Sequence, residues 1–158
     1  MIEQEVTTYM KNDTVLTGLL GATGADSKIY PLQIPQGAAE PYIIYNLISD
    51  GSLEENLLES SLSINVVDDS FKVAETIRNR VLKILDKQDK IRRLIDGDRY
   101  DILWAKNVGG ADFKDPDMDI FYSARIYSFK YVRREAILLE NGEEYLLTED
   151  GERILLQP

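Results

Sequence analysis

The sequence predicts an α/β fold of the α+β type, in which helices flank a mostly antiparallel sheet. Two pairs of apolar stretches with alternating character predict the sheet, because alternation of apolar and polar residues is typical of half-buried strands. One long amphipathic stretch lies between these pairs and predicts a helix over residues 70–87. A shorter helical pattern at the N-terminus completes the set, so helices are expected beside the sheet.

Apolar residues recur at helical spacing in two N-terminal stretches, 2–10 and 15–20. Asp13 lies just before the second stretch, where its carboxylate is suited to cap a helix. Gly21 and Gly24 follow, and glycine is common where helices end. The N-terminus is therefore expected to form a helical segment that ends near residue 21.

The stretch 28–49 contains three prolines and predicts extended structure. Tyr30, Ile34 and Glu40 each precede a proline, which biases them away from helical geometry. Residues 41–49 then predict a strand with apolar side chains on both faces, with Tyr42, Ile44 and Ile48 on one face and Ile43, Tyr45 and Leu47 on the other. One face is expected to pack on helices, and the other needs a second cover from this chain or from a neighbouring subunit.

The remaining strands are predicted in order along the chain. Residues 61–67 alternate cleanly and are expected to pair with 41–49, leaving 50–60 as a long hairpin arm. After the long helix, residues 99–108 and 120–132 predict two more strands, separated by a polar, glycine-rich loop. In the first of these two strands, simple alternation places Tyr100, Ile102, Trp104 and Val108 on one face.

The C-terminal stretch differs in character from the rest of the chain. Its leucine pairs are separated by Asn141-Gly142 and Asp150-Gly151, dipeptides that favour tight hairpin turns. Three short strands in a meander are the predicted structure, and so small a sheet is marginal alone. We therefore predict a main domain over residues 1–135 and a short β extension over 136–158.

Composition excludes several classes of function. The formal net charge is −10, from 28 acidic and 18 basic residues, which argues against a protein that grips nucleic acid by neutralising phosphates. The chain has no cysteine and no histidine, so disulfides, thiolate chemistry and the commonest transition-metal ligand are missing. No apolar run approaches the roughly 20 residues that a membrane helix needs, and the acidic N-terminus is unlike a signal peptide. We expect a protein made and kept in a cytoplasm, without a cofactor.

Three aspartates have part of the pattern of a calcium-binding loop, but the rest of the pattern is missing. Asp115, Asp117 and Asp119 have the alternating spacing of carboxylate ligands. However, Ile120 stands where an EF-hand has its glycine, and Ile126 stands where it has its bidentate glutamate. A solvated or subunit-contact loop is expected here, and no metal site is predicted.

Two sequence segments carry a resemblance to a known family. They are IYPLQIPQGAAEPYIIY at residues 29–45 and SINVVDDSFKVAETIRNRVLKIL at residues 63–85. With the order of predicted elements, these segments resemble the tail-completion or tail-terminator proteins of long-tailed bacteriophages, over roughly residues 1–132. The resemblance implies a six-membered ring on the end of the tail tube, which stops tube growth and offers a surface to the head connector.

The same resemblance implies partners and a location. The partners are other copies of the chain in a homohexamer, the tail tube protein and a head-completion or connector protein. DNA is expected to pass through the ring without specific binding, and no membrane is involved. The expected location is the head-proximal end of the virion tail, after assembly in the host cytoplasm. The family has no catalytic residues to carry over, so an enzyme is not predicted.

Other functions stay open from the residues alone. One alternative is a head-closure or connector protein of the phage neck, which also assembles as a ring. A further alternative is an enzyme that uses carboxylates such as Glu54 and Glu55. The surplus of acid also suggests a hypothesis in which acidic side chains line the ring channel and repel passing DNA.

Five apolar residues in polar connections are the predicted interface candidates. Apolar side chains in such places are typical of docking elements. The candidates are Leu53, Leu57 and Leu58 in the arm, and Phe113 and Met118 in the later loop. The alternative is that these side chains fold back onto the core of their own subunit.

Overall fold

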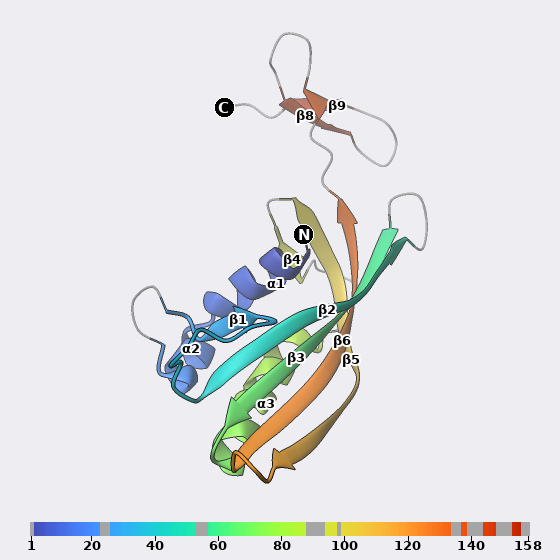
Figure 1. Ribbon diagram of the computed structural model, residues 1–158. Coiled ribbons are helices and arrows are strands. Elements are labelled where there is room, and N and C mark those ends of the chain that lie inside the picture. The colour runs from blue at the N-terminus through green and yellow to red at the C-terminus, as the bar shows by residue number, and fades with distance from the viewer. Residues whose placement is uncertain are drawn as a thin grey trace.

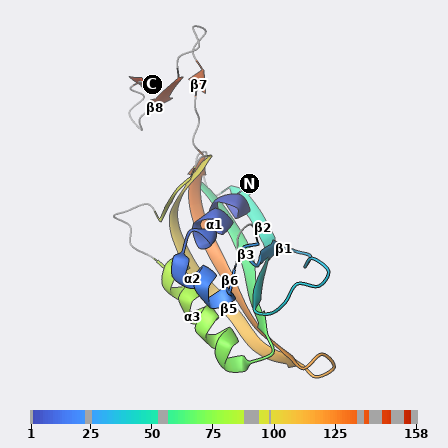
Figure 2. The ribbon, with the colours of Figure 1, turned by 90° about the vertical axis from the view of Figure 1, so that its left-hand side faces the viewer.

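The computed structural model of the protein describes residues 2–22, 26–52, 57–87, 94–97, 99–133, 137–138, 144–147 and 153–155. These residues form a six-stranded mixed sheet, three helices and a second, three-stranded sheet. Figures 1 and 2 show the three helices together on one face of the six-stranded sheet. The predicted α+β fold is confirmed.

The helices begin and end close to the predicted positions. They are α1 (Ile2–Lys11), α2 (Thr14–Leu20) and α3 (Phe71–Leu85). Asp13 caps α2 as predicted, because its Oδ1 accepts a hydrogen bond from the backbone N–H of Leu16 at 2.7 Å. Gly21 ends α2 with φ of 61°, a left-handed conformation that glycine adopts without strain. Within the described residues, no helix combines the length and apolar character needed to span a bilayer.

The main sheet has the strand order β1-β2-β3-β6-β5-β4. Neighbouring strands are antiparallel except β1 and β2, which are parallel. The bounds are β1 (Ile29–Pro31), β2 (Tyr42–Ser52), β3 (Leu57–Asp68), β4 (Ile95–Asp96), β5 (Tyr100–Asp115) and β6 (Ile120–Arg133). The predicted arm is thus mostly a continuation of two paired strands, β2 and β3.

The two faces of the sheet bury apolar residues to different extents. The face toward the helices carries the main core, in which Ile43, Leu62 and Phe129 are fully buried. The opposite face has a smaller cluster centred on Tyr42 and Val67. Adjacent residues Tyr42 and Ile43 therefore point to opposite faces, as the two-sided pattern of this strand predicts.

Strand β5 corrects two predictions from the sequence. Its ladder with β6 shifts register between Ile102 and Trp104 and again between Asn107 and Gly109. Each shift is a bulge, in which one residue lacks a direct partner and the alternation of faces changes phase. Ile102 consequently packs in the helix-side core while Trp104 pairs with Lys130 on the other side, so their predicted common face is wrong.

The predicted loop over 109–119 is also wrong for most of its length. β5 continues to Asp115, and only residues 116–119 form the turn before β6. Glycines at 109 and 110 suggested a loop, but they follow a bulge inside a long strand. At Gly110 the lack of a side chain allows the backbone of β6 to approach closely.

The C-terminal strands confirm the predicted meander. β7 (Ile137–Leu138), β8 (Glu144–Leu147) and β9 (Arg153–Leu155) pair antiparallel in chain order. Figure 1 shows this small sheet beyond the end of β6. The two predicted glycine turns lie outside the described residues, and the domain boundary near residue 135 stays a prediction.

Asp13 joins α2 to α3, and this link predicts a pH dependence of stability. Its Oδ1 and Oδ2 accept hydrogen bonds from Arg80 at 3.0 Å and 2.6 Å. The Arg80 hydrogen bond is the main cause that holds the pKa of Asp13 below its ordinary value. A lowered pKa in the folded state means that this stabilisation is present at neutral pH and is lost as pH falls through that pKa.

We expect Asp13→Asn to flatten the acid end of the stability curve. Urea unfolding between about pH 5 and pH 2 should show a smaller loss of unfolding free energy in the variant than in the wild type. Asparagine still caps a helix, so the cap is preserved while the charge is removed. Equal acid sensitivity in both proteins would contradict this role of the Asp13–Arg80 pair.

Candidate interaction surface

The sheet face opposite the helices, here called the open face, carries a row of apolar side chains across four strands. Phe113 of β5, Tyr122 of β6, Val67 of β3 and Tyr42 of β2 are neighbours in register. Val67 and Tyr42 are buried, but Phe113 is 53% exposed. Its ring stacks on that of Tyr122, with centroids 4.9 Å apart and planes inclined by 6°. The row therefore ends in an aromatic side chain that faces water.

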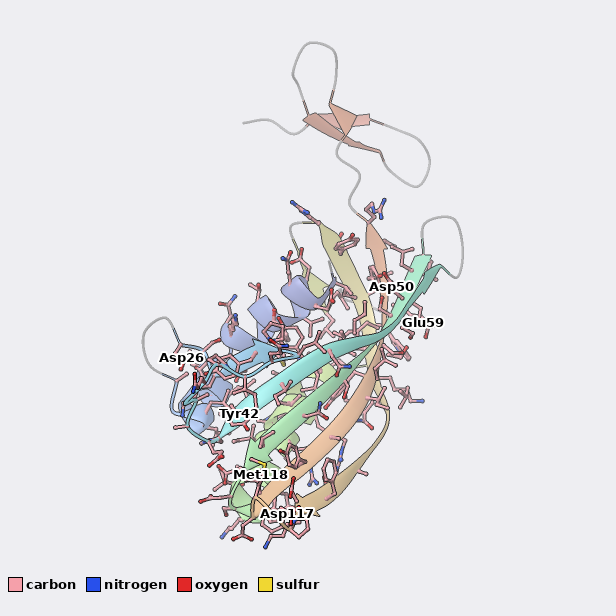
Figure 3. All side chains as sticks on the ribbon, viewed as in Figure 1. Asp26, Tyr42, Asp50, Glu59, Asp117 and Met118 are labelled. Carbon is pink, nitrogen blue, oxygen red and sulfur yellow. The ribbon has the colours of Figure 1, made fainter. Side chains whose placement is uncertain are left out.

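The turn between β5 and β6 extends this apolar end. Met118 is 61% exposed at the turn. Asp115 shapes the turn, because its Oδ1 accepts hydrogen bonds from the backbone N–H groups of Asp117 at 2.9 Å and Met118 at 3.2 Å. Figure 3 shows Asp117 and Met118 together at the end of the hairpin. We call residues 113–119 the tip, and it combines exposed apolar side chains with carboxylates.

Two aspartates of the tip make contacts that shape it. Asp119 pairs with Lys114 at 2.5 Å in an exposed position, and Asp115 is engaged by the turn. Across the part of the chain that the structure describes, no group of three or more carboxylates is arranged to hold a metal ion.

A second feature of the open face lies farther along β5 and β6. Lys130 Nζ lies 5.3 Å from the centroid of the Trp104 ring, within the range of a cation–π interaction. Lys106 is exposed, and it pairs in register with Ser128 beside this contact. Glu59 pairs in register with Lys130, and its carboxylate accepts the Ser128 hydroxyl at 2.7 Å. We call Trp104, Lys106 and Lys130 the lysine patch.

The arm formed by the ends of β2 and β3 is fixed to β6 by hydrogen bonds. Asp50 Oδ1 accepts the hydroxyls of Ser60 at 2.6 Å and Tyr131 at 2.8 Å. These two bonds, that of Ser60 first, lower the pKa of Asp50. Burial raises the pKa of Tyr131 to about 12, so its hydroxyl keeps its proton and remains a donor near neutral pH. Asp50 thus links the ends of β2 and β3 to β6. The labels of Asp50 and Glu59 mark this region in Figure 3.

The predicted interface residues fall at two places. Phe113 and Met118 both belong to the tip and are both exposed. Leu57 is half-buried, and Leu58 is a partly buried residue that packs against the helix-side core of its own subunit. Leu53 lies outside the described residues. The structure therefore brings two of the five candidates into one exposed site and leaves their role as interface residues a prediction.

Sequence reasoning missed the lysine patch and the Asp50 contact. The bulges in β5 hide the patch, because they change which residues share a face with Lys130. The Asp50 contact joins β2 to Tyr131, which lies 81 positions later, and no local pattern reveals such a pair. A lysine near the single tryptophan was the one available signal.

Comparison with known proteins adds a structural likeness. No family model and no curated protein sequence matches the chain. The fold is similar to a chain in a structure described as the virion of a native gene transfer agent particle, with a TM-score of 0.64 and 15% sequence identity. The match covers 83% of this chain and 94% of that chain. At this identity the likeness establishes a shared fold.

Proposed function

We propose that this chain is a structural virion protein that forms a ring on the head-proximal end of a phage tail tube. The ring ends tube polymerisation and provides the surface for head-to-tail joining. The observation that carries this proposal is the likeness to nearly the whole of a chain from a virion particle. The sequence resemblance over residues 1–132 supports the narrower role of a tail terminator.

The open face supports a role in assembly. Phe113 and Met118 are exposed at the tip, where a lone subunit leaves them in contact with water. A heterologous contact repeated around an axis covers such surface in every copy, and it ends in a closed ring when the rotation closes. We propose six copies, with residues 1–135 forming the ring and 136–158 as an extension.

The proposed partners follow from this position. The tail tube protein lies on one side of the ring and a head-completion or connector protein on the other. DNA passes through the channel without specific binding, because a subunit with a formal charge of −10 repels the phosphate backbone. In this proposal the protein acts by assembly and not as an enzyme.

Tail length in particles that lack the protein tests the proposal. We expect overlong tails without heads, because nothing stops tube growth or joins the capsid. Expression of the wild-type chain from a plasmid should restore tails of uniform length. Tails of normal length beside heads that leak DNA would contradict the terminator role and favour a head-closure protein.

A further inference from the structure

We propose that neighbouring copies join head to tail through the open face, where the tip of one copy docks on the lysine patch of the next. This inference rests on the proposed ring and names the contact that builds it. The occupant of the patch is a second copy of this chain, and the argument comes from complementary charge and exposed apolar surface.

The tip offers what a docking element needs. Phe113 and Met118 are 53% and 61% exposed, and both belong to the same short segment. Two exposed large apolar side chains in one segment offer apolar surface to a partner. Asp117 is also exposed beside Met118. The tip contains three aspartates, at 115, 117 and 119, and one lysine, Lys114. It therefore has an excess of negative charge. Aromatic and methionine side chains within a charged rim are typical of interface centres.

The lysine patch offers the opposite charge around an aromatic ring. Among the described residues that pair with the patch in register, the one acid is Glu59, and Lys106 and Lys130 outnumber it. This stretch of the open face therefore has a local excess of positive charge in a strongly acidic chain. Trp104 is half-buried and is engaged by Lys130. Tryptophan is enriched among residues that dominate binding energy, and here it lies among the cations that would meet the aspartates of the tip.

The two features cannot meet within one copy. Both lie on β5, where Lys106 and Asp115 are separated by nine positions, a span of roughly 30 Å in an extended strand. Figure 3 shows Asp117 and Met118 at one end of the sheet, while Glu59, which pairs with Lys130, lies toward the other end. Complementary features at opposite ends of one molecule allow a heterologous contact, the kind that generates rings, and they also allow a two-copy pairing in which each tip meets the other copy's patch. The proposed ring requires the heterologous arrangement, and only that arrangement gives a disulfide ladder longer than two copies.

A charge-reversal experiment tests the contact. Asp117→Lys and Lys106→Glu are each expected to weaken self-association by about 10-fold or more, because each sets like charges opposite each other. Both changes in one chain should restore most of the association. Lys83→Glu, at an exposed position of α3, is the matched control for a change of net charge and should leave association near that of the wild type. Sedimentation measurements at several concentrations, with and without tail tubes, supply the readout.

Disulfide trapping gives a second, independent readout. The chain has no cysteine, so introduced thiols have no competitors. A chain with both Met118→Cys and Lys106→Cys should oxidise to a ladder of multimers that ends at the closed ring. Each single change should give no ladder, because a heterologous contact does not place identical positions together.

The outcomes separate the contact from the proposed function. Loss of association in the single reversals, recovery in the double reversal and a disulfide ladder support the contact. The contact would be overturned if the wild type forms rings, the charge-reversal variants form them equally well, and the double-cysteine variant gives no ladder. The proposed ring itself would stand in that case. A wild-type protein that forms no ring, alone or on tail tubes, would overturn the proposed function itself.

Discussion

Gly110→Ala is expected to destabilise the protein by about 2–4 kcal/mol. Gly110 has φ of 151°, a conformation that residues with a side chain rarely adopt. An added Cβ would clash with the backbone carbonyl of Ala124 and lie 2.7 Å from Arg125 Cδ. Because a backbone atom cannot yield as a flexible side chain does, the β5–β6 ladder would have to shift.

The neighbouring glycine is the matched control for this change. A Cβ at Gly109 meets nothing within 4 Å, and its φ is outside the left-handed region. Gly109→Ala should therefore change the free energy of unfolding by well under about 1 kcal/mol. Urea unfolding of the two variants decides the matter. Similar stabilities would contradict the close approach of the two strands at Gly110.

Asp112→Ala is the second large effect, with an expected loss of about 1–3 kcal/mol, between the values typical of exposed and buried ion pairs. The Asp112 carboxylate accepts hydrogen bonds from Ser123 at 2.6 Å and Arg78 at 2.8 Å, and it forms an ion pair with Arg125 at 3.0 Å. The arginine side chains are only 13% and 17% exposed. Removing the carboxylate takes away the acid that these two mostly buried arginine side chains share, although Arg78 keeps Glu75 and Asn79 as partners. The loss of this shared acid costs more than the loss of an exposed pair.

The lowered pKa of Asp112 predicts how the stability difference between wild type and Asp112→Ala changes with pH. Burial acts to raise its pKa, but the hydrogen bonds from Ser123 and Arg125 and the positive charges of Arg125 and Arg78 outweigh burial and lower it. The stabilisation is therefore present at neutral pH and is lost as pH falls through the lowered pKa. Chemical unfolding at neutral and acid pH should show that the gap between wild type and Asp112→Ala narrows in acid.

An exposed ion pair between the end of the same strand and the following turn is the control for Asp112. Lys114 and Asp119 pair at the tip, with side chains 47% and 82% exposed. Such pairs contribute little because water screens them. Lys114 Nζ also lies 5.0 Å from the centroid of the Phe121 ring, so Lys114→Ala should cost at most about 1 kcal/mol. A loss as large as that of Asp112→Ala would show that the tip, and not the arginine contacts, holds β5 in place.

The fold was predictable where the pattern of side chains is unbroken. Asp13 before a helical stretch and Gly21 after it identified α2, and the two-sided pattern of residues 42–47 gave the correct faces of β2. In β5 the same reasoning gave the wrong face for Trp104, because bulges change the phase of alternation. The position of a bulge cannot be predicted from the alternation of apolar and polar residues alone.

The candidate site was predictable only in part for the same physical reason. Phe113 and Met118 stand out in sequence as apolar residues in a polar stretch, and the structure exposes both. Lys106 and Lys130 can be recognised as one patch only once β5 and β6 are paired, because that pairing places Lys130 against Trp104 and beside Lys106. Sites that depend on the register of distant strands need the fold before they can be seen.

The mass of the purified protein in solution tests the central claim most directly, which is that this chain assembles into a closed ring. Sedimentation equilibrium across a range of concentrations, alone and with isolated tail tubes, should detect a six-copy species that does not grow into longer polymers. A protein that stays monomeric at the highest concentration and also in the presence of tail tubes would contradict the claim.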